Sequence, residues 1–316
     1  MKPEKIRAAR NRTLTLSESD IEFFSPRLKT LSRPASLCDL ENQIFCQDLF
    51  SILDFLPETC VDLLILDPPY NLTKSFNGRV FSACSTAEYV AYLEMWLPKL
   101  LKTLKPTASV YLCADWRMSA AVQSVLEKYL IVRNRITWER EKGRGAKKNW
   151  KNCSEDIWFA TLSHHYTFNA DAVKLKRRVI APYRENGMPK DWEETESGNF
   201  RLTAPSNLWT DITVPFWSMP ENTDHPTQKP EKLIAKLMLA SSNEGDLVFD
   251  PFLGSGTTAV VAKKLQRRFV GIEIDRLYCC LAAKRLALAE HDKTIQGYRD
   301  GVFWERNTFQ LQQIST

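Results

Sequence analysis

Residues 61–72 (VDLLILDPPYNL) constrain the fold of this chain more than any other stretch. Five of the six residues from 61 to 66 are apolar, a pattern typical of a strand that is buried on both faces of a sheet. Pro68 and Pro69 directly follow Asp67, and proline fits neither a central strand nor the interior of a helix. The strand is therefore predicted to end at Asp67. Open α/β sheets bind ligands at the carboxyl ends of their strands, although an ordinary turn would explain the same residues.

Strand and helix patterns alternate along most of the chain. Apolar runs predict strands at residues 44–47, 61–66, 108–114, 131–138, 156–162, 247–249 and 268–272. Amphipathic patterns and capping residues predict helices at residues 49–56, 86–104, 117–128, 231–241, 257–265 and 277–291. Thr86 is expected to cap the second of these helices and Pro106 to end it, and residues 74–85 are expected to form a flexible loop. This alternation predicts an α/β fold, in which a doubly wound and mostly parallel sheet carries helices on both faces.

The composition excludes some classes of protein and leaves others open. No apolar run approaches the roughly 18 residues that a membrane span needs, and the first twelve residues lack the apolar core of a secretory signal. The eight cysteines are scattered without a Cys-x-x-Cys pair, so we expect reduced thiols, no metal site and a cytoplasmic location. A net charge of +5 is mild, and it suits a nucleic-acid partner only where the positive residues cluster.

Positive residues cluster in three stretches. Residues 139–152 (EREKGRGAKKNWKN) predict a loop or lid with a basic face. Residues 163–224 interleave basic and aromatic residues, a combination that suits phosphates and bases, although an ordinary surface subdomain would also explain it. Residues 1–40 are polar and basic, and we expect a solvated, partly disordered arm there, with phosphate contacts as the alternative.

A second motif, residues 248–258 (VFDPFLGSGTT), predicts a strand, a glycine-rich turn and the start of a helix. Gly254 and Gly256 would let a ligand approach the backbone, and the free N–H groups of the helix start suit a carboxylate or phosphate. Glu273 stands 17 positions beyond Gly256, at the end of the next strand, where it could bind ribose hydroxyls. The motif indicates an adenosine-bearing cofactor, but alone it does not separate NAD from S-adenosylmethionine. The late position of the glycine turn and the lack of an evident acid–base pair argue against a dinucleotide-dependent oxidoreductase.

Three motifs in a fixed order resemble those of the S-adenosylmethionine-dependent DNA amino-methyltransferases. They are DPPY (67–70), HPTQKP (225–230) and DPFLGSG (250–256), and their order is similar to that of the β group, in which the catalytic motif precedes the cofactor motif. The likeness covers about residues 42–290. It implies a Rossmann-like methyltransferase sheet with an inserted target-recognition region, S-adenosylmethionine as cofactor and double-stranded DNA as partner.

The resemblance also divides the chain. The expected parts are a basic N-terminal arm (1–40), the catalytic half of the methyltransferase domain (41–162), a target-recognition region (163–224) with a basic lid from about 139, the cofactor-binding half (225–292) and a C-terminal tail (293–316).

The resemblance implies roles for the residues of the catalytic motif. The Asp67 carboxylate and the Pro68 carbonyl would accept the two hydrogens of the target amine, while the Pro68–Pro69 pair fixes these acceptors. Tyr70 would stack on the target base, which must be flipped out of the duplex, and Asn71 would support the loop. Trp138 could flank that base, but it suits the core of the protein at least as well.

The implied cofactor-binding set is Asp48, Lys229, Asp250, Phe252, Gly254, Ser255, Gly256, Thr257 and Glu273. Asp48 is expected at the adenine amino group, Glu273 at the ribose hydroxyls and Lys229 at the methionine carboxylate, where Thr227 is a further candidate. Asp250 could equally cap the turn, and Thr257 could equally cap the helix. The candidate DNA contacts are Lys142, Arg144, Lys147, Lys148, Arg177 and Arg178.

The predicted reaction is methyl transfer to the exocyclic amine of a flipped base. Adenine N6 is the expected target and cytosine N4 the alternative, because the chemistry is the same and an Asp at the first motif position favours adenine. A dinucleotide-dependent oxidoreductase and a non-catalytic DNA-binding module are remote alternatives. A homodimer and a cognate restriction endonuclease are candidate partners besides DNA.

Overall fold

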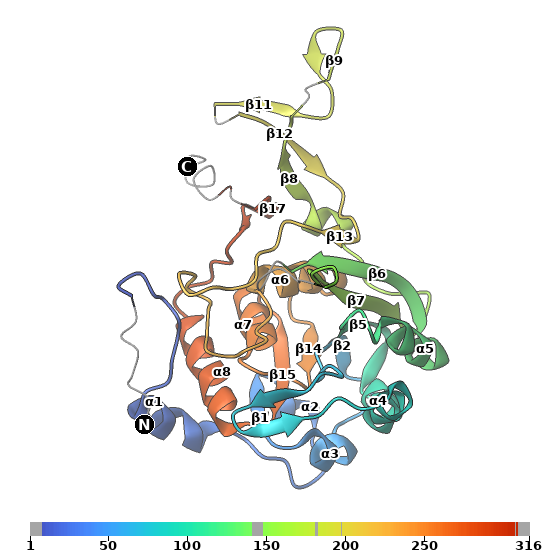
Figure 1. Cartoon of the computed structure of the whole chain (residues 1–316), viewed down its shortest axis with the longest axis vertical. Coiled ribbons are helices and arrows are strands. Elements are labelled where there is room, and N and C mark those ends of the chain that lie inside the picture. Colours follow the sequence, from blue (N-terminus) through green and yellow to red (C-terminus); the bar gives the residue numbers. More distant parts are fainter. Residues whose placement is uncertain (1–7, 141–147, 181–182, 197, 307, 309–316) are drawn as a thin grey trace.

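The computed structural model describes residues 8–140, 148–180, 183–196, 198–306 and 308. Its centre is an eight-stranded sheet (Figure 1) in the order β1-β15-β14-β2-β5-β7-β6-β13. In that order the strands are Gln43–Cys46, Arg268–Glu273, Leu247–Asp250, Val61–Leu66, Leu104–Ala114, Ser154–Thr161, Ile131–Glu139 and Leu208–Trp209. Neighbouring strands pair in parallel except at β7, which runs antiparallel to both β5 and β6. The predicted mostly parallel α/β sheet is therefore confirmed.

Helices cover both faces of this sheet. Side chains of α3 (Leu49–Ile52), α4 (Thr86–Leu101) and α5 (Ser119–Tyr129) fill the core on one face, and those of α6 (Glu231–Ser241), α7 (Thr257–Lys264) and α8 (Arg276–Leu288) fill the core on the other. Strand β2 supplies both cores because successive side chains of a strand point to opposite faces. Leu64 and Leu66 join the first core, while Leu63 and Ile65 join the second. The sheet is therefore doubly wound, as predicted.

The stretch between β2 and β5 differs from its prediction in three places. Ser85, not Thr86, caps α4. Pro106 lies inside β5 and is exposed there, in a stretch where the pairing with β2 is interrupted, so its missing N–H breaks no ladder bond. The expected flexible loop contains a hairpin of β3 (Lys74–Phe76) and β4 (Arg79–Phe81).

A second, smaller sheet projects from the body (Figure 1). Its order is β11-β12-β8-β17-β16, with the bounds Glu193–Thr195, Gly198–Thr203, Leu175–Arg178, Val302–Trp304 and Tyr298–Arg299. Strands β9 (Arg184–Glu185) and β10 (Met188–Pro189) form a further hairpin near its tip. This projecting sheet combines the expected target-recognition region with two strands from the expected C-terminal tail. The described part of that tail is therefore not a free end, since β17 pairs with β8.

The described part of the N-terminal segment packs against the body rather than forming a solvated arm. Helix α1 (Glu18–Phe24) lies against α8, where the Lys284 ammonium donates to the Asp20 carboxylate at 2.7 Å. Leu14 forms a parallel bridge with Thr223, close to the HPTQKP segment. The remaining short elements are α2 (Leu37–Leu40) and the 3-10 turns η1 (Ser25–Arg27), η2 (Leu53–Phe55) and η3 (Ala170–Val173). Among the described residues, no helix is both long and apolar enough to cross a membrane.

Candidate active site

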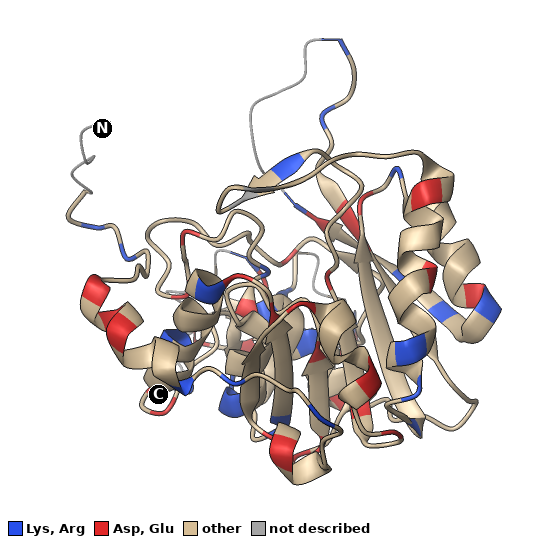
Figure 2. Cartoon of the chain, turned by 90° about the horizontal axis from the view of Figure 1, so that it is seen from below, with Lys and Arg blue, Asp and Glu red and all other residues tan. Residues whose placement is uncertain are grey.

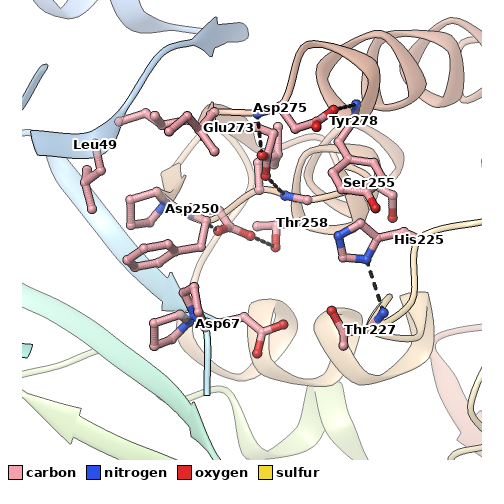
Figure 3. Close-up of a pocket in the computed structure, with 18 of the residues that line it drawn as sticks. Leu49, Asp67, His225, Thr227, Asp250, Ser255, Thr258, Glu273, Asp275 and Tyr278 are labelled. Carbon is pink, nitrogen blue, oxygen red and sulfur yellow. Dashed lines mark hydrogen bonds between the residues drawn. The ribbon is translucent and has the colours of Figure 1, made fainter. Parts of the chain in front are cut away.

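A pocket of about 380 Å³ lies at the carboxyl ends of β2, β14 and β15. Its lining joins residues from both halves of the chain, including the DPPY motif, the glycine-rich turn and part of the HPTQKP segment. Figure 3 shows Asp67 at one side of the pocket, Glu273 at the opposite side and Asp250 between them. The sheet therefore brings together side chains that lie almost two hundred residues apart in the sequence.

The DPPY loop is held by bonds on both sides of Tyr70. The hydroxyl of Tyr89, on α4, donates to the Pro69 carbonyl at 3.1 Å. Asn71 is buried, and its side chain bonds both the N–H and the carbonyl of Cys84, at 2.7 and 2.8 Å. The loop that follows Asp67 is thus fixed by hydrogen bonds as well as by its two prolines, which is the rigidity that a positioning site needs.

Lys229 lies against the Asp67 carboxylate. Its ammonium donates to both carboxylate oxygens at 2.7 Å and to the Tyr70 hydroxyl at 3.2 Å. Burial disfavours the ammonium ion, but the negative charges of Asp67 and Glu155 outweigh burial, and the pKa of Lys229 is raised. Each carboxylate oxygen can accept two hydrogen bonds, so Asp67 retains acceptor capacity for a substrate amine. The methionine carboxylate was the expected contact of Lys229, and its pairing with the catalytic motif was not foreseen.

The glycine-rich turn is shaped by backbone conformations that other residues rarely adopt. Gly254 and Gly256 have φ angles of 54° and 85°, in the left-handed region. The N–H of Gly254 donates to one Glu273 carboxylate oxygen, and the N–H of Asp275 donates to the other, each at 2.8 Å. Burial raises the pKa of Glu273 against the effect of these bonds. Glu273 therefore both fixes the turn and lines the pocket.

Asp250 caps the turn, one of the two roles that the sequence allowed. Its carboxylate accepts from the Phe252 N–H at 3.0 Å and from the Thr258 hydroxyl at 2.5 Å. Burial raises the pKa of Asp250 to about 7. Thr257 is not a helix cap, because Gly256 holds that position, and the Thr257 hydroxyl donates instead to the Lys229 carbonyl at 3.1 Å.

The other expected cofactor residues also reach the pocket. Asp48 lines it and at the same time caps α3, accepting from the Phe50 N–H at 2.8 Å. Phe252, Ser255 and Thr227 are part of the lining. The pocket thus brings together eight of the nine residues of the expected cofactor-binding set. The ninth, Gly256, does not line the pocket and instead caps α7 against Ala282.

The expected DNA contacts are tested less completely. Lys142, Arg144 and Lys147 lie outside the described residues. Lys148 is exposed, and Figure 2 shows Lys and Arg residues on the described segment that extends outward next to this gap.

Arg177 and Arg178 lie on β8 of the projecting sheet, and both bond the Glu305 carboxylate, Arg177 through its side chain and Arg178 through its backbone N–H. Trp138 is a core residue, buried and bonded to the Ile212 carbonyl, so it does not flank a flipped base.

Two buried charged residues at the site were missed. Glu155 lies in β7 beside Tyr70, and Arg285 on α8 donates to the Ser255 carbonyl and the Thr257 hydroxyl within the glycine-rich turn. Glu155 directly precedes the expected strand at 156–162, and a carboxylate at the start of a buried strand needs a buried partner, so this signal could have identified Glu155 from the sequence.

Comparisons with known proteins place this geometry in a known group. A family model described as DNA methylase, and named for N6 and N4 methyltransferases, matches residues 61–284. The Type II methyltransferase M.HpaI of Haemophilus parainfluenzae is 32% identical over 250 residues, covering 78% of this chain and 74% of its own length. The DNA adenine methyltransferase YhdJ of Escherichia coli is 32% identical over 271 residues, covering 84% and 89%.

A solved structure shares the fold. The crystal structure of the M1.HpyAVI-SAM complex is 24% identical in sequence and matches with a TM-score of 0.51. The match covers 77% of this chain and 99% of that chain. The central sheet and its helices are therefore those of a methyltransferase fold.

Proposed function

Since the chain belongs to the DNA methylase family of N6- and N4-directed methyltransferases, we propose that it methylates the N6 amine of adenine in double-stranded DNA. The chain is an S-adenosylmethionine-dependent DNA methyltransferase. The observation that carries the proposal is the position of the Asp67 carboxylate, at the end of β2 and inside the pocket that Glu273 and the glycine-rich turn also line. Adenine is favoured by the name of the Escherichia coli relative and by the Asp that begins the motif. Cytosine N4 is the second candidate, because the family model covers both amines.

The residues of the pocket fit the cofactor. Glu273 offers carboxylate oxygens for ribose hydroxyls, and the left-handed Gly254 brings bare backbone to the pocket wall. Asp48 lines the same pocket and offers an acceptor for the adenine amino group. When bound, S-adenosylmethionine supplies a methyl group on a positively charged sulfonium, which is the electrophile of the reaction.

The protein contributes positioning and charge. The amine of a nucleobase is a weak nucleophile because its lone pair is delocalised into the ring. Asp67 and the Pro68 carbonyl would accept its two hydrogens and turn the lone pair toward the methyl group. As the N–C bond forms and the C–S bond of the sulfonium breaks, one amine proton becomes acidic and would pass to the Asp67 carboxylate that already accepts it. Asp67 would thus act first as a fixed acceptor and only then as a base. Lys229 holds Asp67 in this role through the ion pair at 2.7 Å.

The first prediction tests both the reaction and the base. Purified protein should transfer label from methyl-labelled S-adenosylmethionine to duplex DNA, and modified-base sequencing of DNA from expressing cells should show N6-methyladenine in one sequence context. N4-methylcytosine in place of N6-methyladenine would show that cytosine N4 is the methylated amine. No transfer to any DNA, with binding of NAD(H) instead, would contradict the assignment. The Asp67→Ala variant is the negative control for contaminating activity.

The second prediction concerns the basic lid. Lys148 and Lys151 are exposed. They precede Cys153, whose carbonyl accepts from the N–H of Arg140, a residue whose side chain reaches the site. Replacing both lysines with Ala should weaken DNA binding and reduce the slope of log affinity against log salt by up to about two units, because each lost phosphate contact removes roughly 0.9.

The matched control replaces Lys99 and Lys102, near the end of α4 and away from the pocket, and it should leave the slope unchanged. Equal slopes in both variants would place the DNA surface elsewhere.

Three further proposals concern a partner enzyme, the location in the cell and the oligomeric state. A cognate restriction endonuclease is supported by the name Type II methyltransferase of the Haemophilus parainfluenzae relative. A cytoplasmic location is supported by the bacterial source of these relatives. A homodimer rests on the family resemblance alone, and the mass of the protein in solution tests it.

A further inference from the structure

Glu155 reaches the site because β7 is reversed. The parallel strands of the sheet end at the pocket, whereas β7 begins there, as the pairing of Ala114 at the end of β5 with Asp156 shows. Glu155 is the second residue of β7, and it is 4% exposed. It does not line the pocket itself, although Asp67, Tyr70 and Lys229 do. Any effect of Glu155 on a bound substrate must therefore pass through these neighbours.

The contacts of Glu155 join it to each part of the catalytic loop. The Tyr70 hydroxyl donates to its Oε2 at 3.2 Å, and the Lys229 ammonium lies 3.5 Å from the same oxygen. The Arg140 guanidinium donates to Oε1. With the bonds from Lys229 to Asp67 and to Tyr70, this forms a closed set of Asp67, Tyr70, Glu155 and Lys229, which we call the Glu155 network.

Charge and geometry in this network are matched. Both carboxylates of the network have cationic partners, since Lys229 pairs with Asp67 and Glu155, and Arg140, outside the network, pairs with Glu155. Tyr70 stays neutral, since burial raises the pKa of its hydroxyl, and the carboxylates of Asp67 and Glu155 add to this effect. A neutral hydroxyl donates a directed hydrogen bond, which fixes the far end of the tyrosine ring. The direction of the ring's long axis is then set by Glu155 at one end and by the backbone at the other.

We propose that Glu155 is a positioning residue for methyl transfer, which holds the Tyr70 ring and the Lys229–Asp67 pair in the geometry that the flipped base requires. The proposal rests on the function proposed above. It assigns Glu155 a role in turnover and in base capture, with no part in cofactor binding, because Glu155 lies on the Asp67 side of the pocket, joined to Tyr70 and Lys229 rather than to Glu273 or the glycine-rich turn. Through Arg140, which directly follows β6 at the start of the basic lid, it also joins the catalytic loop to the segment expected to meet DNA.

The experiment compares Glu155→Gln with a matched control on the same strand. Asp156 is the adjacent buried carboxylate. It accepts from the Thr137 hydroxyl at 3.3 Å and lies 3.8 Å from Arg135, and neither of these described partners belongs to the catalytic loop. Glu155→Gln should lower the single-turnover rate by about 10²-fold, the size typical of misplaced reacting groups, while the dissociation constant of S-adenosylmethionine changes less than about three-fold. Asp156→Asn should keep the rate within about three-fold of wild type.

Two readouts separate positioning from general loss of structure. 2-Aminopurine at the target position reports base capture by fluorescence, and Glu155→Gln should reduce this signal at saturating DNA. Tyr70→Phe removes only the hydroxyl, and it should also slow turnover with cofactor binding kept. The double variant Glu155→Gln/Tyr70→Phe should be no slower than the slower single variant, because both changes break one unit.

The results distinguish failure of the proposed role of Glu155 from failure of the proposed function. Wild-type turnover in Glu155→Gln, or losses that multiply in the double variant, would overturn the role of Glu155 in an enzyme that still methylates DNA. If Glu155→Gln does not fold, Tyr70→Phe carries the test, since wild-type turnover and base capture in that variant would overturn the anchoring of the ring. Wild-type protein that transfers no methyl group to DNA would instead refute the proposed function.

Discussion

Asp67→Ala should lower the methyl-transfer rate by at least about 10³-fold while S-adenosylmethionine still binds. The carboxylate is the charged acceptor at the end of β2, where the Lys229 ammonium pairs with it. Glu155, the other carboxylate beside this ammonium, does not line the pocket and cannot replace it. Cofactor binding is expected to persist because Glu273 and the glycine-rich turn lie at the opposite side of the pocket. Single-turnover kinetics and a calorimetric titration of the cofactor measure the two effects separately.

Two companion variants sharpen this result. Asp67→Asn keeps the shape and one acceptor oxygen but removes the charge, so its rate should fall between those of wild type and Asp67→Ala. Asp54→Ala removes an exposed carboxylate that pairs with Lys99, and it should leave the rate unchanged. Full turnover in Asp67→Ala would show that the DPPY segment is an ordinary turn.

Gly256→Ala should abolish cofactor binding and destabilise the fold. Gly256 caps α7 with a φ of 85°, and a Cβ there would lie 2.5 Å from the Ala282 Cβ and 2.9 Å from its Cα. The left-handed conformation costs a non-glycine residue about 1–2 kcal/mol, and the forced separation of α7 from α8 adds about 1–3 kcal/mol. The helices must move apart, and the glycine-rich turn moves with them.

Gly245 provides the control for backbone strain alone. Its φ is 80°, but a Cβ there would meet no atom within 4 Å. Gly245→Ala should therefore lose only the stability that the left-handed conformation costs, about 1–2 kcal/mol, and it should keep its cofactor affinity. Thermal unfolding with and without S-adenosylmethionine measures both quantities. Equal losses in the two variants would show that conformational strain, rather than packing of the turn against α8, controls this site.

The sequence predicted those parts of the site whose backbone conformation is determined by a few neighbouring residues. The apolar run before Asp67, the two prolines and the paired glycines restrict the backbone by themselves, so the strand, the loop and the turn could be predicted from a few residues. The order of the motifs then supplied the family.

Contacts between distant segments could not be predicted in this way. Lys229 lies 162 positions beyond Asp67, and Glu155 lies on a strand whose reversed direction has no signature in its own residues. Asp67 and Glu155 both contact the Lys229 ammonium because β2, β5 and β7 lie side by side and the loop before α6 reaches their ends. This is a property of the sheet order rather than of any local pattern. The strands of the C-terminal segment are two and three residues long, too short to show periodicity.

The projecting sheet sets a condition for exchanging target specificity between relatives. Residues 163–224 supply three of its five strands, and residues 298–304 supply the other two. The C-terminal strand β17 is also tied to the body, since the Lys232 ammonium on α6 donates to the Trp304 carbonyl. A transplant of residues 163–224 alone would separate β8 from its native neighbour β17 and expose a sheet edge. The target-recognition region that the sequence predicts would thus be a split module, encoded by two separate portions of the gene that must be inherited or engineered together.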